Sequence, residues 1–191
     1  MKRFNIGIDV DDTITNTFDY LMPYIAEFFQ VDLEYLKENN ISYTTLPKPM
    51  IERELELAKT VYDGVILDTP LKNDVCEYIN KLKEDGHNIY FITARTNEIY
   101  KDAKGLTTKY LNKHNIPYDK VICTKDKVTA CKENNIDLFI DDSINHCTKI
   151  SKTDIEVLLF SCKSNKYFND LKKVYSWKEI YNYIREKSKG V

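Results

Sequence analysis

The stretch Phe4–Thr13 reads FNIGIDVDDT and carries the strongest structural signal in the chain. Its first half alternates large apolar side chains with Asn and Gly, a pattern that indicates a short buried strand. Three carboxylates, Asp9, Asp11 and Asp12, follow directly after it. Open α/β sheets bind their ligands outside the carboxyl ends of the strands. The stretch therefore places a cluster of acids where such a sheet would have a site.

Crowding acids in this way has a cost that something must offset. Two carboxylates about 4 Å apart repel each other by roughly 4 kcal/mol at an effective dielectric constant near 20. A hard divalent cation such as Mg²⁺, which prefers oxygen ligands, is the simplest compensation. The alternative is that the acids are helix caps or lie in a solvated turn, as in many Asp-rich loops after strands. The stretch alone leaves both interpretations open.

Bulk composition indicates a soluble globular protein of one domain, or of a core domain that carries an insert. The chain has 191 residues, of which 42% are hydrophobic and 30% charged, which suits a globular protein with a real core. Its net charge of −2 disfavours binding to a nucleic-acid polymer. We expect no membrane association, because no run of about 18 apolar residues occurs. The N-terminal sequence lacks the apolar region of a secretory signal.

The cysteines and histidines favour a reducing, cytoplasmic location without a zinc site. The five cysteines are odd in number and form no C-x-x-C pair. The three histidines, His87, His114 and His146, show no zinc-ligand spacing, so we expect them to be surface or interface residues.

The segment between Thr13 and about Asp68 has helical periodicity and no strand signal. Its apolar spacing predicts one helix that Pro23 should kink or break, and a confident helix ending near Gly64. The predicted segments are helices at Thr17–Gln30, Asp32–Glu38 and Met50–Tyr62, with a turn-rich stretch at Ser42–Pro49. This segment is expected to form an all-helical insert after the first strand.

From Pro70 onward, predicted strands and helices alternate. Asp74 with Glu77, and Ser176 with Glu179, resemble capping boxes at helix starts. The predicted strands are Asn88–Thr93, Lys120–Cys123, Ile136–Ile140 and Ile155–Phe160. The predicted helices are Asp74–Gly86, Ile99–His114, Lys127–Asn134, Ile144–Ile150 and a last helix ending near Lys187, with a polar loop at Ser161–Leu171.

This alternation predicts an α/β fold with a central parallel sheet and right-handed crossovers, a Rossmann-like three-layer sandwich. Residues 1–13 and 69–191 would form the core, and residues 14–68 a small helical cap inserted after the first strand.

Four polar signals fall at or just after predicted strand ends, where a parallel sheet would bring them into one pocket. They are Asp9 with Asp11, Thr93, Lys127, and Asp141 with Asp142. Each type has a use in phosphoryl transfer. An Asp can be the nucleophile, a second Asp the acid and base, and Mg²⁺ can draw charge from the phosphate. Thr and Lys can hold phosphoryl oxygens. Lys125 competes with Lys127 for the lysine role, and Lys127 is preferred because it lies nearest the predicted helix start.

These motifs resemble those of the haloacid dehalogenase superfamily of phosphohydrolases. The resemblance lies in DVDDT at Asp9–Thr13, ITAR at Ile92–Arg95, Lys127, and FIDDS at Phe139–Ser143. The resemblance implies that Asp9 is the nucleophile and Asp11 the general acid and base. It also implies that phosphate is bound by Thr93, Ala94 and Lys127. Mg²⁺ would be held by Asp9, Asp141 and the backbone carbonyl of Asp11, with Asp142 beside the metal.

Within that superfamily the chain looks most like the bacterial relatives of the cytosolic-type 5′(3′)-deoxyribonucleotidases, because of its size, early cap and motif spacing. Two features depart from that family: Asp12 stands where Gly is usual, and Ala94-Arg95 follows the phosphate-binding Thr. Both departures bear on the nucleotide substrate and leave the phosphatase chemistry intact. Arg95 is expected to contact a second substrate group or to pair with a surface acid.

The expected function is a Mg²⁺-dependent phosphomonoester hydrolase that forms an aspartyl-phosphate and acts on a nucleotide. A phosphatase for another small phosphomonoester, such as a sugar phosphate, is the alternative. The non-enzyme alternatives are a phospho-accepting receiver module and a catalytically dead binding protein. Four aromatic residues of the insert could stack on a base or simply form core: Phe18, Tyr20, Tyr43 and Tyr62. The oligomeric state is left open.

Overall fold

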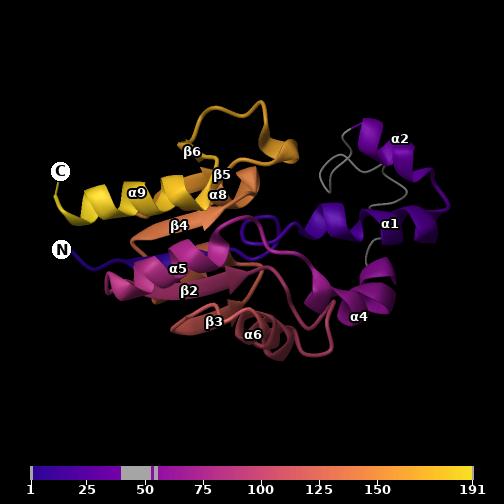
Figure 1. Cartoon of the computed structure of the whole chain (residues 1–191), viewed down its shortest axis with the longest axis horizontal. Helices are drawn as coiled ribbons and strands as arrows, with labels where there is room; N and C mark the ends of the chain where they lie inside the picture. The colour runs from indigo at the N-terminus through magenta and orange to yellow at the C-terminus, as the bar shows by residue number, and fades with distance from the viewer. Residues whose placement is uncertain (1, 40–52, 54–55, 191) are drawn as a thin grey trace.

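The computed structural model describes residues 2–39, 53 and 56–190, and its centre is a six-stranded sheet (Figure 1). The strand order is β3-β2-β1-β4-β5-β6, and every neighbouring pair is parallel. The strands are β1 (Asn5–Ile8), β2 (Asn88–Thr93), β3 (Lys120–Cys123), β4 (Leu138–Asp141), β5 (Glu156–Phe160) and β6 (Lys173–Val174).

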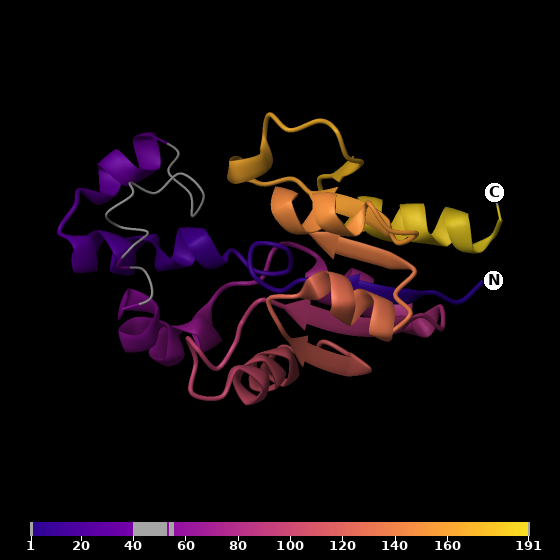
Figure 2. The same cartoon turned by 180° about the vertical axis from the view of Figure 1, so that it is seen from behind.

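Helices cover both faces of the sheet and make three layers. On one face α5 (Val75–Glu84), α6 (Ala103–Lys113) and α9 (Trp177–Ser188) share an apolar cluster with β1. On the other face α7 (Lys127–Glu133) and α8 (Ile144–Ile150) pack on β2, β4 and β5, and these helices lie in front in Figure 2. The α/β three-layer fold predicted from the sequence is confirmed.

Strand β1 lies at the centre of the sheet because its sequence suits burial on both faces. Ile6 and Ile8 have no exposed surface. Gly7 is needed for close packing: a Cβ there would lie 2.7 Å from the Phe139 ring on the adjacent strand β4. Burial of β1 fixes the position of Asp9, the residue that directly follows it.

The described residues of 14–68, called here the helical insert, lie together at the end of the molecule opposite the chain termini (Figure 1). They form α1 (Thr17–Phe29), α2 (Leu33–Glu38), η1 (Ala58–Tyr62), α4 (Asp63–Val65) and η2 (Ile66–Asp68). Their apolar side chains make a cluster of their own, which reaches the sheet domain at Tyr100 and Ala103. No helix in the described part of the chain is both long and apolar enough to cross a membrane.

The insert leaves and re-enters the core through two connections that are hydrogen-bonded to each other. Thr15 pairs with Leu71 in an isolated antiparallel bridge. The Asn16 N–H donates to the Pro70 carbonyl at 2.9 Å, and the Lys72 N–H donates to the Ile14 carbonyl at 2.9 Å. Both connections therefore lie side by side, close to the end of β1.

Two helix predictions in the insert concern Pro23 and the helix end near Gly64. Pro23 does not break α1, which is continuous over Thr17–Phe29 because the loss of one hydrogen bond is outweighed by its buried face. The alternative, a kink at Pro23, stays a prediction. The α-helical run ends at Val65, next to Gly64 as predicted, and a 3-10 turn over Ile66–Asp68 follows it, in which Ile66 is fully buried. The turn-rich stretch Ser42–Pro49 and most of the first half of Met50–Tyr62 lie outside the described residues.

Other differences concern the core. Asp74 does not cap α5 with its side chain, because its left-handed backbone (φ 62°) turns the side chain away. Helix α6 begins at Ala103 rather than Ile99, since Asp102 caps it by accepting from the Gly105 N–H. Strand β4 is shifted to Leu138–Asp141, and the short strand β6 had no sequence signal.

Candidate active site

A pocket of about 800 Å³ opens at the carboxyl ends of the strands, between the core and the helical insert. Every site residue proposed from the sequence lines it: Asp9, Asp11, Thr93, Ala94, Arg95, Lys127, Asp141 and Asp142. The sheet topology explains the gathering, because β2 and β4 flank β1 and their carboxyl ends adjoin Asp9.

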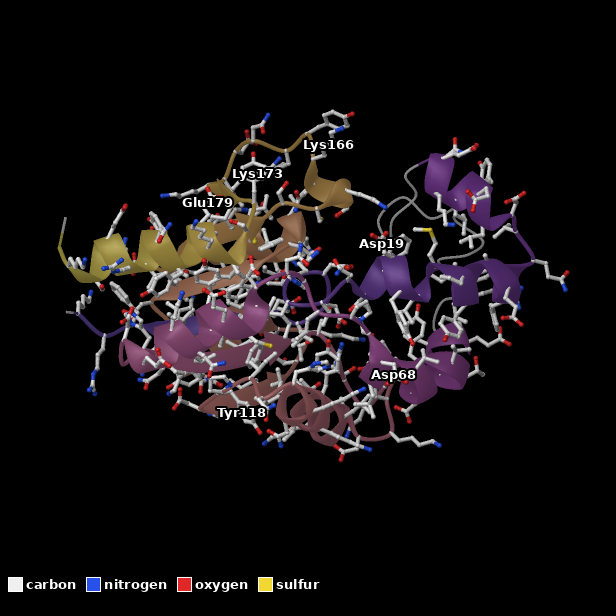
Figure 3. The ribbon with its side chains drawn as sticks, in the orientation of Figure 1. Asp19, Asp68, Tyr118, Lys166, Lys173 and Glu179 are labelled. Carbon is white, nitrogen blue, oxygen red and sulfur yellow. The ribbon has the colours of Figure 1, made fainter. Side chains whose placement is uncertain are left out.

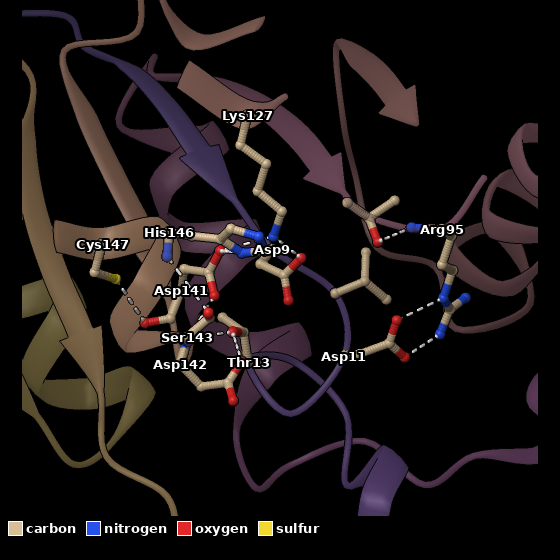
Figure 4. A network of polar contacts seen from close by, with 12 residues as sticks. Asp9, Asp11, Thr13, Arg95, Lys127, Asp141, Asp142, Ser143, His146 and Cys147 are labelled. Atoms are coloured by element: carbon tan, nitrogen blue, oxygen red, sulfur yellow. Dashed lines mark hydrogen bonds and ion pairs between the residues drawn. The ribbon is translucent and has the colours of Figure 1, made fainter. Parts of the chain in front are cut away.

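Lys127 is the central cation of the pocket (Figure 4). It is the first residue of α7, and its buried ammonium donates to Asp9 Oδ1 and, at 2.7 Å, to Asp141 Oδ2. Burial acts to lower the Lys127 pKa, but attraction to Asp141 and Asp9 outweighs it and raises the pKa. Lys125, by contrast, is exposed and pairs with Glu98. The structure thus places Lys127 rather than Lys125 among the acids.

Asp141 is held in place by the start of helix α8. Its Oδ1 accepts from the Ser143 N–H at 2.8 Å, and His146 Nδ1 lies 3.2 Å from its Oδ2. Burial acts to raise the Asp141 pKa, but Lys127 outweighs it, so the pKa is lowered. His146 was expected at the surface or at an interface, and its side chain is 23% exposed. The signal for its position was its place one helical turn after the capping residue Ser143.

Three of the acids form a compact cluster that could hold a metal. Carboxylate oxygens of Asp9, Asp141 and Asp142 lie within 4.8 Å of one another. Burial raises the pKa of Asp9 to about 7 and that of Asp142 well above its usual value. Buried, crowded oxygen ligands of this type fit Mg²⁺, which favours carboxylates. From the sequence, Asp142 was expected only to support the metal site, whereas in the structure its carboxylate offers an oxygen to the cluster.

The Asp11 carboxylate lies on the opposite side of the loop, bound to Arg95 (Figure 4). Arg95 Nε donates to Asp11 Oδ2 at 2.9 Å and Nη2 to Oδ1 at 2.6 Å, a bidentate pair. The Thr17 hydroxyl donates to the same Oδ1 at 2.7 Å. Burial acts to raise the Asp11 pKa, yet Arg95 outweighs it and lowers the pKa. The expectation of a surface acid as partner of Arg95 is wrong, because Arg95 is only 2% exposed.

Thr93 and Ala94 lie where the phosphoryl oxygens are expected. Thr93 is the last residue of β2 and is fully buried. Its Oγ1 accepts from the Arg95 N–H at 3.3 Å, which shapes the turn after the strand. Their contact with phosphate stays a prediction.

Asp12 links the loop to the insert. It has a left-handed backbone (φ 57°), a conformation that glycine adopts more readily, and its Oδ1 accepts from the Phe18 N–H at 3.1 Å. It thereby supplies the α1 cap that the Asn16 side chain does not. Burial raises the Asp12 pKa to about 6.

The outer part of the pocket is largely apolar. Phe18 and Tyr62, two of the four aromatic residues singled out in the sequence, line it together with Ile99 and Tyr100, which sequence reasoning missed. Of the other two, Tyr20 lies against Tyr24, with the rings tilted and their centroids 6.0 Å apart, and Tyr43 lies outside the described residues.

An ion pair links the insert to the core at the rim of this pocket. Asp19 of α1 faces the loop that follows β5 (Figure 3), and Lys163 Nζ from that loop donates to Asp19 Oδ1 at 2.9 Å. Both side chains are about half exposed, so the pair contributes little stability.

Comparison with known proteins gives consistent matches. The family model described as "5′ nucleotidase, deoxy (Pyrimidine), cytosolic type C protein" matches residues 3–189. A protein named nucleotidase from Clostridium acetobutylicum is 29% identical over 198 residues, covering 100% of both chains.

Solved structures share the fold. One, of a predicted phosphatase from Clostridium acetobutylicum, has a TM-score of 0.69 at 14% identity and covers 97% of this chain and 100% of that one. Another, a haloacid dehalogenase superfamily hydrolase from Ehrlichia chaffeensis, has a TM-score of 0.59 at 15% identity and covers 97% and 98%. The fold, the pocket and the family match agree, and the chain is a phosphoric monoester hydrolase of the haloacid dehalogenase type that belongs to the cytosolic type C 5′ nucleotidase family.

Proposed function

We propose that the protein hydrolyses nucleoside monophosphates in a Mg²⁺-dependent reaction that passes through a phosphoryl group on Asp9. One observation carries the proposal: Asp9 emerges from the central strand into a buried cluster with Lys127, Asp141 and Asp142. Three acids and one lysine, desolvated together, suit the binding of a cation and an anionic phosphate. Mg²⁺ would be held by Asp9, Asp141 and Asp142, where it would neutralise charge on the phosphoryl oxygens.

The side chains divide the chemical work. Lys127 binds Asp9 Oδ1, so Oδ2 is the oxygen that forms the bond to phosphorus while the bond to the leaving oxygen breaks. Asp11 supplies the proton to the leaving oxygen and later takes one from the water that hydrolyses the acyl phosphate. This second step regenerates Asp9 and releases inorganic phosphate. Because Asp11 must be protonated to donate, its pair with Arg95 has to loosen in the first step.

The helical insert supports the nucleotide assignment. We propose that residues 14–68 act as a cap over the strand ends, since both connections to the core lie beside the Asp9 loop. A cap in this position can exclude water and contact the leaving group. The apolar side chains of Phe18 and Tyr62 in the pocket suit a nucleobase better than a sugar alone.

A substrate panel tests this function. Purified protein would be assayed on an aryl phosphate, nucleoside 5′- and 3′-monophosphates and sugar phosphates, with Mg²⁺ titrated after removal of metals. We expect no turnover without Mg²⁺ and the highest kcat/KM among nucleotides. Activity that survives exhaustive chelation would refute the metal requirement, and a preference for sugar phosphates would refute the nucleotide assignment.

The intermediate has its own test. Rapid quenching during turnover, followed by peptide mapping, should find the phosphoryl group on Asp9, and Asp9→Asn should abolish the label. A phosphoryl group trapped on any other residue would overturn the assignment.

We also propose that the protein works in a reducing compartment such as the cytoplasm. All five cysteines are free in the structure, which supports this location.

A further inference from the structure

We propose that Arg95 forms a leaving-group subsite, in which it recognises a neutral oxygen acceptor of the substrate while it positions Asp11. This inference rests on the proposed function, because it concerns the part of the same pocket that receives the leaving group. The substrate class it selects is phosphomonoesters whose leaving group carries a hydroxyl or carbonyl oxygen. Simple aryl phosphates lack this group.

The first observation is an unused donor on a buried guanidinium. The Arg95 side chain is 1% exposed, and its Nε and Nη2 are taken up by Asp11. Its third nitrogen, Nη1, is buried and has no hydrogen-bond partner among the described residues. In Figure 4 this nitrogen points away from Asp11. Buried donors without a partner are rare and costly in folded proteins, so a partner from outside the chain is expected.

The second observation is the place of Arg95 in the pocket. It lines the pocket together with the phosphoryl-site residues and with the apolar side chains of the outer part. Its guanidinium carbon lies 6.0 Å from the centroid of the Tyr100 ring, so an aromatic side chain supports the cation from one side. Arg95 therefore belongs to the same pocket as the phosphoryl-site residues and the aromatic side chains that we propose receive the leaving group.

Charge balance decides the chemical class of the acceptor. Asp11 already neutralises the guanidinium through a bidentate pair, so an anion at Nη1 would add an uncompensated negative charge to a buried pair that is already neutral. A neutral oxygen satisfies the donor without that penalty. Nucleosides carry such oxygens on the sugar and on most bases, whereas phenol carries none beyond the ester oxygen itself.

The proposal predicts a different effect on two kinetic constants. Arg95→Met removes the support of Asp11, so kcat should fall for both phenyl phosphate and a nucleoside monophosphate. It also removes the subsite, so KM should rise about tenfold for the nucleotide alone, the scale of one hydrogen bond to a charged group. A purely positioning role would lower kcat equally and leave the ratio of the two KM values unchanged.

A binding measurement gives a readout without turnover. In the inactive Asp9→Asn background, calorimetry with Mg²⁺ present should show that Arg95→Met weakens nucleoside monophosphate binding about tenfold but leaves inorganic phosphate binding unchanged. Equal loss for both ligands, or loss for neither, would overturn the subsite. Arg95→Lys is the second variant in case Arg95→Met does not fold. The lysine ammonium can pair with Asp11 but has no equivalent of the Nη1 donor. The KM for the nucleotide should therefore rise in this variant as well.

The matched control is Lys125→Met, which removes an exposed cation that pairs with Glu98 rather than with a pocket acid. It should change neither KM nor affinity, which separates the subsite from a general loss of positive charge. Failure of the proposed function would look different: the wild-type protein would hydrolyse neither substrate. Hydrolysis of both substrates, with the Arg95→Met variant keeping the wild-type KM ratio, would refute only the subsite.

Discussion

Strand β1 has polar side chains around both of its ends, and the two ends are built differently. At the amino end, the Phe4 N–H donates to His87 Nδ1 at 3.1 Å, and the Asn5 N–H donates to Asp137 Oδ2 at 2.8 Å. At the carboxyl end, buried Lys127 lies between Asp9 and Asp141. The amino end matches side chains to backbone groups, whereas the carboxyl end crowds ionised side chains against each other.

The difference shows which end is arranged for stability and which for chemistry. A hydrogen bond between a side chain and a backbone group contributes about 1 kcal/mol. The charged partner at the amino end, Asp137, stays exposed to solvent. A buried charge cluster gains little or nothing over apolar packing, because desolvation offsets the attraction. Burial raises the pKa of Asp9 to about 7 and so acts against the charged form that the chemistry needs. Substitutions at the two ends should therefore have different consequences.

The largest effect is expected at the carboxyl end from Asp9→Asn. An amide is not a nucleophile, so kcat on an aryl phosphate should fall by about 10⁴-fold or more, the scale for loss of a nucleophile. Stability should not fall, because the substitution removes a carboxylate whose burial outweighs its attraction to Lys127. Steady-state kinetics and urea unfolding without Mg²⁺ test the two statements. A variant that is both inactive and clearly less stable would contradict the division between the ends.

The next effect separates two acids of the same pocket. Asp11→Asn should reduce kcat by about 10²–10⁴-fold, as for a lost general acid and base. It should keep Mg²⁺ affinity, because the Asp11 carboxylate points to Arg95, away from the acid cluster. Asp141→Asn should instead weaken Mg²⁺ affinity directly. Mg²⁺ titration of activity and of binding distinguishes them, and equal metal affinities would show that the roles are not divided in this way.

The sequence predicted which residues gather at the carboxyl end of β1 much better than it predicted which side chains pair there. Strand periodicity placed Asp9 and Thr93 at strand ends, and parallel topology then required them to meet. The pair of Asp11 with Arg95 joins residues 84 positions apart, and no local pattern encodes side-chain direction over that distance. Strand β6 spans only two residues, too few for a periodic signal.

The residues that cap the helices could be predicted only in part from the sequence. Ser176 does accept from the Glu179 N–H and so caps α9 as predicted. Asp74 has the same type of sequence context, but its left-handed backbone prevents the side chain from capping α5. The choice between these conformations depends on the path of the preceding chain, which tertiary packing decides. Sequence signals for caps identify candidate residues rather than their geometry.

At the amino end of β1, substitution of Asn5 should affect stability and leave activity unchanged. Asn5→Ala removes a side chain whose Nδ2 donates to the Asn135 carbonyl at 2.9 Å and whose Oδ1 accepts from Asn88 Nδ2 at 2.8 Å. The free energy of unfolding should fall by about 1 kcal/mol, since these groups remain partly solvated. The kcat should be unchanged, because Asn5 lies at the other end of β1 from Asp9.

A double-mutant cycle refines the test. Asn88→Ala removes one of the same hydrogen bonds, so the two losses of stability should be less than additive when combined. Full additivity would show that the bond between Asn5 and Asn88 contributes nothing, and a lower kcat at unchanged stability would contradict the separation of the two ends.

The smallest effect concerns the pH dependence of stability at the amino end. Burial lowers the His87 pKa, and the ring stacks on Phe4 at 5.6 Å between centroids while its Nδ1 accepts the Phe4 N–H. The neutral ring is therefore the native form. In the unfolded chain His87 takes up a proton near its ordinary pKa of about 6.5. Below that pH the unfolded state binds more protons, so stability should fall as the pH drops from 7 towards the lowered native pKa.

One proton sets an upper limit on this slope of about 1.4 kcal/mol per pH unit. Urea unfolding between pH 7.5 and 5 would be compared with His87→Asn, whose side-chain oxygen can accept the same N–H but does not titrate. The variant should be less stable at pH 7.5, because the smaller side chain leaves part of the buried site unfilled. Its loss of stability on acidification should be smaller than that of the wild type. If both proteins lose stability equally between pH 7 and 5, His87 does not contribute to the dependence, and the carboxylates of the protein account for all of it.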